Sequence, residues 1–160
     1  ILYICIVKYR IQLIHNIMKI SKVFIASDHA GFNLKETIKK FLIKKGKKVL
    51  DLGTKNRNSV DYPVYAHKLC NKIKKNNKQF GILVCGSGAG MYMAANRHKN
   101  IRAALCYSVK STKLTRLHNN ANVMTIGARL TKKNVALKCV NIFIQTNFIG
   151  GRHLRRVKKI

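Results

Sequence analysis

Short apolar runs alternate with amphipathic segments along most of this chain, and this alternation restricts the fold more than any other feature. Each run is short enough to be a buried strand, and the segment after it repeats apolar residues with the spacing of a helix. Strands that alternate with helices predict a parallel sheet covered on both faces. The expected strands are residues 23–27, 48–52, 81–85, 101–106 and 122–127, and the expected helices are residues 33–45, 61–75, 91–99, 108–120 and 131–145.

This pattern predicts a single α/β domain, in which a doubly wound, parallel, five-stranded sheet lies between two layers of helices. The chain has 160 residues, enough for one such core. We expect the domain to span residues 18–160, because Met18 directly precedes the first strand. Residues 1–17 are expected to be an N-terminal extension outside it, and Lys8 and Arg10 interrupt the apolar run that a membrane span would need.

The net charge of the chain is +29, because 33 Lys and Arg residues face four Asp and Glu residues. Such an excess is typical of nucleic-acid binders. Few aromatic residues interleave with the lysines, however, so no platform for stacking bases is indicated. Lysines such as Lys39, Lys40 and Lys44 fall in a helical segment and are expected on its surface. We interpret the charge as compositional drift, with weak affinity for polyanions as a side effect.

The cysteines contain no C-x-x-C pair, so neither a disulfide framework nor a zinc site is indicated. A reducing cytoplasm is the simplest location for a chain with free thiols. The cysteines are Cys5, Cys70, Cys85, Cys106 and Cys139.

The third apolar run ends in Cys85 and leads into the loop GSGAG at residues 86–90. Such a loop aims backbone N–H groups at one spot, which suits a phosphate or an oxyanion formed during a reaction. A thiol at a strand end before a glycine turn favours the thiolate form, although a buried structural thiol is the alternative. Asp28 and His29 follow the first strand, so we expect their loop to meet residues 85–90 in one pocket.

Nine short motifs follow one another along the chain. They are SDHAGF (27–32), DLGT (51–54), DYPVYA (61–66), VCGSGAG (84–90), AAN (94–96), IRAA (101–104), RLHNNANV (116–123), IGAR (126–129) and GGRHLRRV (150–157). Each motif is weak by itself, but together they cover nearly everything from Met18 to Val157. In this order and spacing the motifs resemble a known family, the sugar-phosphate isomerases of the ribose-5-phosphate isomerase type B and galactose-6-phosphate isomerase group.

The resemblance implies a flavodoxin-like, Rossmann-like sheet and a homodimer with its active sites between the subunits, a tetramer being the alternative. It implies aldose–ketose isomerisation of ribose 5-phosphate and ribulose 5-phosphate through an enediolate, without metal or cofactor. A six-carbon substrate, such as galactose 6-phosphate or allose 6-phosphate, is the alternative within the family. No specific nucleic acid and no membrane is expected as a partner. A non-catalytic nucleic-acid-binding module and a flavin-binding electron carrier are more distant alternatives.

The resemblance also assigns roles to residues at matching positions. Cys85 is expected to be the base that moves a proton between C1 and C2, with Ser87 near the enediol oxygens. His118 is expected to open the sugar ring, with Asp28 close to the ring oxygen. Substrate contacts are expected from Tyr62, Gly86, Gly88, Gly90 and Asn119, and phosphate contacts from His29, Arg129, Arg152 and Arg156.

Overall fold

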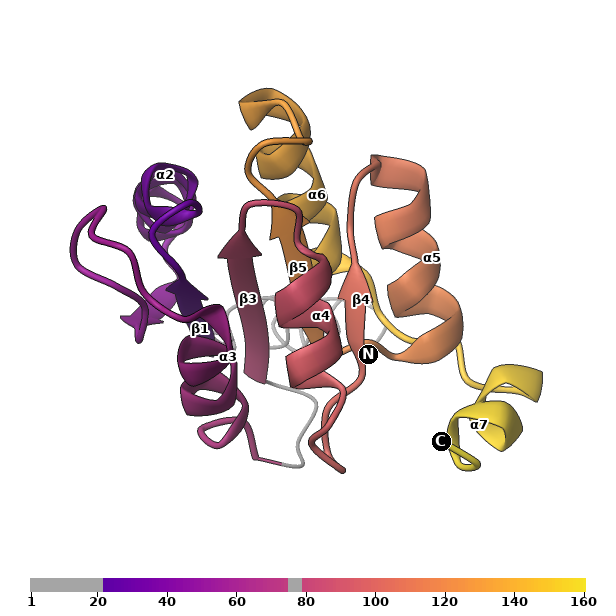
Figure 1. Cartoon of the computed structure of the whole chain (residues 1–160). Coiled ribbons are helices and arrows are strands. Elements are labelled where there is room, and N and C mark those ends of the chain that lie inside the picture. Colours follow the sequence, from indigo (N-terminus) through magenta and orange to yellow (C-terminus); the bar gives the residue numbers. More distant parts are fainter. Residues whose placement is uncertain (1–21, 75–78) are drawn as a thin grey trace, which may run out of the picture.

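The fold is a five-stranded parallel sheet with the strand order β2-β1-β3-β5-β4 (Figure 1). The computed structural model describes residues 22–74 and 79–160, so the extension predicted for residues 1–17 lies outside the described residues. The doubly wound α/β class is confirmed. The elements are β1 (Lys22–Ser27), α2 (Phe32–Lys44), β2 (Lys48–Asp51), α3 (Tyr62–Cys70), β3 (Gln79–Cys85), α4 (Ala89–Ala95), β4 (Ala103–Leu105), α5 (Val109–Asn119), β5 (Val123–Gly127), α6 (Lys133–Gln145) and α7 (Arg152–Val157).

Helices cover both faces of the sheet and create two apolar cores (Figure 1). On one face, α2 and α6 pack against alternate strand residues such as Ile25, and α5 packs against α6. On the other face, α3 and α4 pack against the intervening residues such as Phe24. Burial on both sides explains why the strands read as continuous apolar runs. Among the helices of residues 22–74 and 79–160, none combines the length and apolar character that crossing a membrane would require.

Several helix boundaries differ from the predicted ones, and hydrogen bonds explain two of the differences. Helix α2 begins at Phe32 rather than Asn33, since Asp28 accepts a hydrogen bond from the N–H of Gly31 at 2.9 Å. Helix α3 ends at Cys70, well before residue 75. Helix α4 ends at Ala95 because the side chain of Asn96 pairs with both backbone groups of Ala103.

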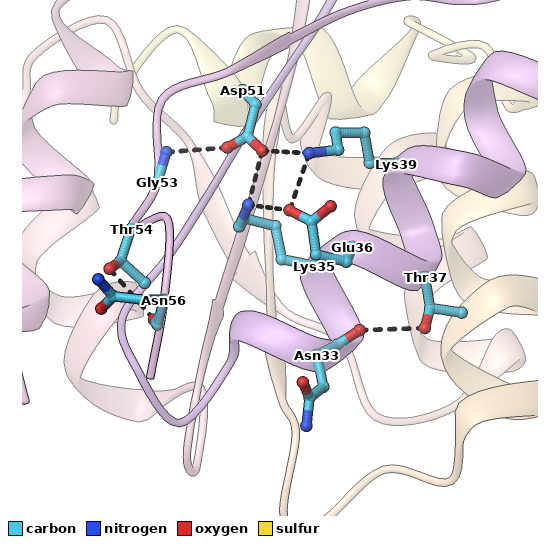
Figure 2. A network of polar contacts seen from close by, with 9 residues as sticks. All are labelled: Asn33, Lys35, Glu36, Thr37, Lys39, Asp51, Gly53, Thr54 and Asn56. Atoms are coloured by element: carbon cyan, nitrogen blue, oxygen red, sulfur yellow. Dashed lines mark hydrogen bonds and ion pairs between the residues drawn. The ribbon is translucent and has the colours of Figure 1, made fainter. Parts of the chain in front are cut away.

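Four charged side chains close into an ion cluster between α2 and β2 (Figure 2). The ammonium groups of Lys35 and Lys39 both donate to Glu36 Oε1, at 2.5 and 2.8 Å, and to Asp51 Oδ2, at 2.6 and 2.8 Å. The Lys35 side chain is only 1% exposed, and Lys39, which was expected on the helix surface, is about a quarter exposed. Burying an ion costs several kcal/mol unless partners surround it, and the two carboxylates supply that compensation.

The ion cluster should make the free energy of unfolding depend on pH in the acid range. Although burial favours the protonated form, hydrogen bonds from Lys35 and Lys39 lower the pKa of Glu36 and Asp51 below their ordinary values of 4.5 and 3.8. A lowered folded-state pKa gives stability that is complete above the unfolded-state pKa and is lost as the pH falls through the folded value. Each pKa unit of difference between the two states corresponds to about 1.4 kcal/mol.

We therefore expect stability to fall steeply below about pH 4.5. Urea unfolding at a series of pH values would measure this decline, and the double variant Glu36→Gln, Asp51→Asn should show a flatter profile over the same range. A variant profile as steep as that of the unaltered chain would contradict the assignment.

Candidate active site

A cavity of about 300 Å³ lies at the carboxyl ends of β1 and β3. The chain runs from β1 to one side of the sheet and from β3 to the other, and this topological switch is where doubly wound proteins bind ligands. The loops after the first and third strands meet here, as predicted. The cavity is lined by Asp28, His29, Ala30, Tyr62, Cys85, Gly86, Ser87, Gly90, Arg129 and Leu130.

Cys85 is the last residue of β3, and its side chain forms part of the cavity wall although it is only 4% exposed. Its Sγ accepts a hydrogen bond from the N–H of Gly88 at 3.1 Å. This contact requires a sharp turn, and Gly88 has a φ of +83°. A Cβ atom there would lie 2.9 Å from the backbone nitrogen of Gly127. An N–H group aimed at sulfur stabilises a thiolate more than a thiol.

Two glycines of the loop allow the side chains of Tyr62 and Arg129 to approach its backbone closely, because glycine has no side chain of its own. A Cβ atom on Gly90 would lie 2.6 Å from the ring of Tyr62, so the phenol packs directly on the backbone there. A Cβ atom on Gly86 would lie 3.3 Å from the guanidinium of Arg129. Ser87 is exposed, and its hydroxyl accepts a hydrogen bond from the N–H of Ala89 at 3.3 Å. Phenol, guanidinium and hydroxyl groups therefore line the same cavity as Cys85.

Asp28 and His29 enter the cavity from the end of β1. Asp28 is 6% exposed, and its backbone N–H donates to the carbonyl of Val84 at 3.3 Å, which ties the two loops together. The Nδ1 atom of His29 lies 3.2 Å from the backbone nitrogen of Val60 and 3.3 Å from its carbonyl oxygen. In either tautomer Nδ1 forms a hydrogen bond with the backbone of Val60, so Nε2 is the ring nitrogen that remains to bind a ligand.

Four predicted site residues lie elsewhere, on α5 and α7, and we call them the α5–α7 group. They are His118, Asn119, Arg152 and Arg156, none of which lines the 300 Å³ cavity. Helix α7 stands away from the sheet beside the end of α5 (Figure 1). Within one chain the predicted site residues therefore form two separate groups, one at the cavity and one on α5 and α7.

The α5–α7 group has its own internal order, which sequence reasoning missed. The ring of His118 stacks on the ring of His153, with centroids 4.2 Å apart and planes within 1°. Burial lowers the pKa of His153, and the nearby His118, Arg152 and Arg156 lower it further. The GGRHLRRV motif did contain this histidine between the two arginines, but only the packing of α7 on α5 shows its partner.

Arg116 is a second residue that sequence reasoning missed. Its guanidinium is buried at 5% exposure, and burial lowers its pKa to about 10. It donates to the carbonyl oxygens of Thr146 and Ala121, at 3.1 and 2.5 Å, and to the Asn120 side chain at 3.1 Å. These bonds fix the turn that ends α5 and hence the place of His118.

A larger cavity of about 800 Å³ lies along the edge strand β4. Asn119, Val157 and Ile160 are among its lining residues, so it borders the α5–α7 group. Its lining includes none of the candidate catalytic residues on β1 and β3, and size alone does not make it the active site.

Comparison with known proteins places this chain in one family. Residues 23–160 match the ribose/galactose isomerase family. The chain is 37% identical over 139 residues to ribose-5-phosphate isomerase B of Escherichia coli. The aligned region covers 87% of this chain and 93% of the relative.

Two solved structures are similar to this one along most of their length. A ribose 5-phosphate isomerase from Thermotoga maritima has a TM-score of 0.84 at 50% identity, covering 87% of this chain and 96% of the other. Ribose-5-phosphate isomerase B from Mycoplasma genitalium, solved with bound ribulose 5-phosphate, has a TM-score of 0.83 at 44% identity, covering 86% and 92%. The predicted resemblance is confirmed, and this chain belongs to the ribose/galactose isomerase family.

Proposed function

We propose that this chain is an aldose–ketose isomerase that interconverts ribose 5-phosphate and ribulose 5-phosphate. One observation carries the proposal: a cysteine sulfur that accepts a backbone N–H bond lies in the wall of a polar cavity at the switch point of the sheet. Family membership supports it, and the similar Mycoplasma enzyme was solved with ribulose 5-phosphate bound. Neither a nucleic-acid-binding module nor a flavin carrier would need such a thiol.

In the proposed mechanism, the Cys85 thiolate takes the proton from C2 of the open-chain aldose. The electrons of the broken C–H bond form the C1=C2 bond of an enediolate, and negative charge develops on O1. The hydroxyl of Ser87 and the backbone N–H groups of Gly86 and Gly90 stabilise that charge. The thiol then returns its proton to C1, while a proton passes from O2 to O1, which gives the ketose. Gly88 is assigned an indirect role, because its N–H binds the sulfur of Cys85 rather than the substrate.

The two ends of the sugar are held by different groups. Asp28 lines the same cavity as Cys85 and is assigned to the ring oxygen during ring opening, together with His118. Tyr62 contacts the sugar hydroxyls from α3. His29 and Arg129 bind the phosphate, which orients the reacting carbons by an interaction remote from them.

We infer that the active site is completed by a second copy of the chain. His118, Asn119, Arg152 and Arg156 do not reach the cavity of their own chain, yet matching positions in the family are assigned to the same substrate. The two arginines are exposed on α7, where an anion could reach them. A homodimer in which each α5–α7 group enters the cavity of the partner accounts for this separation, and a tetramer would pair two such dimers. Free thiols at Cys70 and Cys139 fit a reducing cytoplasm.

Kinetics with several sugar phosphates test the proposed reaction. We expect kcat/KM for ribose 5-phosphate to exceed that for allose 6-phosphate and galactose 6-phosphate by about 100-fold, because a longer sugar displaces either its phosphate or its reacting carbons. A higher kcat/KM for either six-carbon sugar would transfer the assignment to the alternative substrate. No turnover of any of the three would refute the isomerase assignment.

A further inference from the structure

The ion cluster holds the turn that follows β2, and this turn contacts the end of β1 beside the candidate active site. Asp51 uses its two oxygens differently: Oδ2 accepts from both lysines, and Oδ1 accepts from the N–H of Gly53 at 3.0 Å. The cluster therefore connects an ammonium group, through one carboxylate, to the backbone of the turn (Figure 2).

Lys35 supports the same turn with its methylene stem. A Cβ atom on Gly53 would lie 3.0 Å from Cδ of Lys35 on one side and 2.5 Å from the backbone nitrogen of Ser27 on the other. The turn is thus enclosed between the lysine stem and the end of β1. The N–H of Thr54 donates to the carbonyl of Ser27 at 3.1 Å, which closes the contact. Lys39 binds the same carboxylates, but no contact of its stem with Gly53 is found among the nearest atoms.

The segment that starts at this turn, residues 52–61, leads to three cavity residues. Ser27, which it contacts, directly precedes Asp28. Farther along, the backbone of Val60 holds Nδ1 of His29. The segment then enters α3 at Tyr62, which packs on the glycine loop.

We propose that Lys35 is a positioning residue of the sugar-phosphate site. Its ammonium fixes Asp51 and its stem supports Gly53, so the 52–61 segment presents His29 and Tyr62 in the geometry that binds substrate. Lys35 does not touch the substrate itself. The proposal rests on the proposed function, since it assigns the segment to that reaction.

Steady-state kinetics of Lys35→Met with ribose 5-phosphate test this role. We expect KM to rise about tenfold, because misplaced binding groups weaken binding even when they are remote from the reacting bond. We expect kcat to stay within about threefold, because Cys85 lies on a different strand. A purely structural role would reduce the folded fraction and hence the apparent kcat, but it would not change KM.

Lys39→Met is the matched control, because it also removes one ammonium group that binds Glu36 and Asp51. It should leave KM within about twofold of the unaltered value. Asp51→Asn keeps an oxygen for Gly53 but loses the charge that binds Lys35, so it should raise KM as Lys35→Met does. The double variant Lys35→Met, Asp51→Asn should raise KM no further, because both changes break one connection.

The outcomes separate this inference from the function on which it rests. An unaltered chain that does not turn over ribose 5-phosphate would refute the proposed function. An active unaltered chain with a normal KM in both Lys35→Met and Asp51→Asn would refute the positioning role, as would an equal rise of KM in Lys39→Met. If Lys35→Met does not fold, Asp51→Asn decides by the same measurement.

Discussion

Replacement of Cys85 by serine should lower kcat for ribose 5-phosphate by about 100- to 10,000-fold, the range of general acid–base catalysis. Serine keeps the shape of the side chain and can still accept the N–H of Gly88, which binds Sγ at 3.1 Å. Its hydroxyl, however, is far less acidic than a thiol, so no alkoxide is present to take the C2 proton. Because the phosphate and hydroxyl contacts remain, KM should stay within about threefold.

Cys70→Ala is the matched control for this experiment. Cys70 is also a buried free thiol, but it is the last residue of α3 and packs in the apolar core, where burial raises its pKa to about 12. A thiol that stays protonated cannot act as a base, so kcat should not change in this variant. A normal kcat in Cys85→Ser would show that another group moves the proton.

The fold could be predicted from sequence because its signals are local. Apolar runs of strand length, glycine after a helix and serine before one need only neighbouring residues, and Ser108 does cap α5 by accepting the N–H of Ser111 at 3.2 Å. The ends of α3 and α4 could not be placed in this way. The end of α4 depends on a side chain, Asn96, that bonds with Ala103 on the following strand.

The cavity was predictable for a different reason. A parallel sheet places the ends of its strands at one edge, so residues that follow β1 and β3 had to meet once the topology was correct. The buried Lys35 was not predicted, although two signals were present. Lys35 shares a helix face with Ile38 and Leu42, and Glu36 and Asp51 are two of only four acids in the chain. Because lysines are so abundant in this chain, Lys35 was expected on the surface like the others. It is buried instead, because its ammonium pairs with acids on both α2 and β2.

Mixing two inactive variants should restore activity if each active site is shared between subunits. One chain carries Cys85→Ser and has no base, and the other carries Arg152→Ala and Arg156→Ala and binds phosphate poorly. In a mixed dimer one of the two sites combines the intact Cys85 of one chain with the intact arginines of the other. Random pairing makes half of all dimers mixed, so co-expression should give about a quarter of the unaltered activity.

A control for this experiment uses two variants from the same cavity, Cys85→Ser and Asp28→Asn. Both residues line the cavity of one chain, so every site of their mixed dimer carries one of the two defects and activity should not return. The arginines are exposed on α7, and their replacement should leave the fold intact. Activity of the first mixture that merely equals the mean of its two components would mean that no site is shared. The α5–α7 group would then have to reach the cavity of its own chain, across the distance that now separates them.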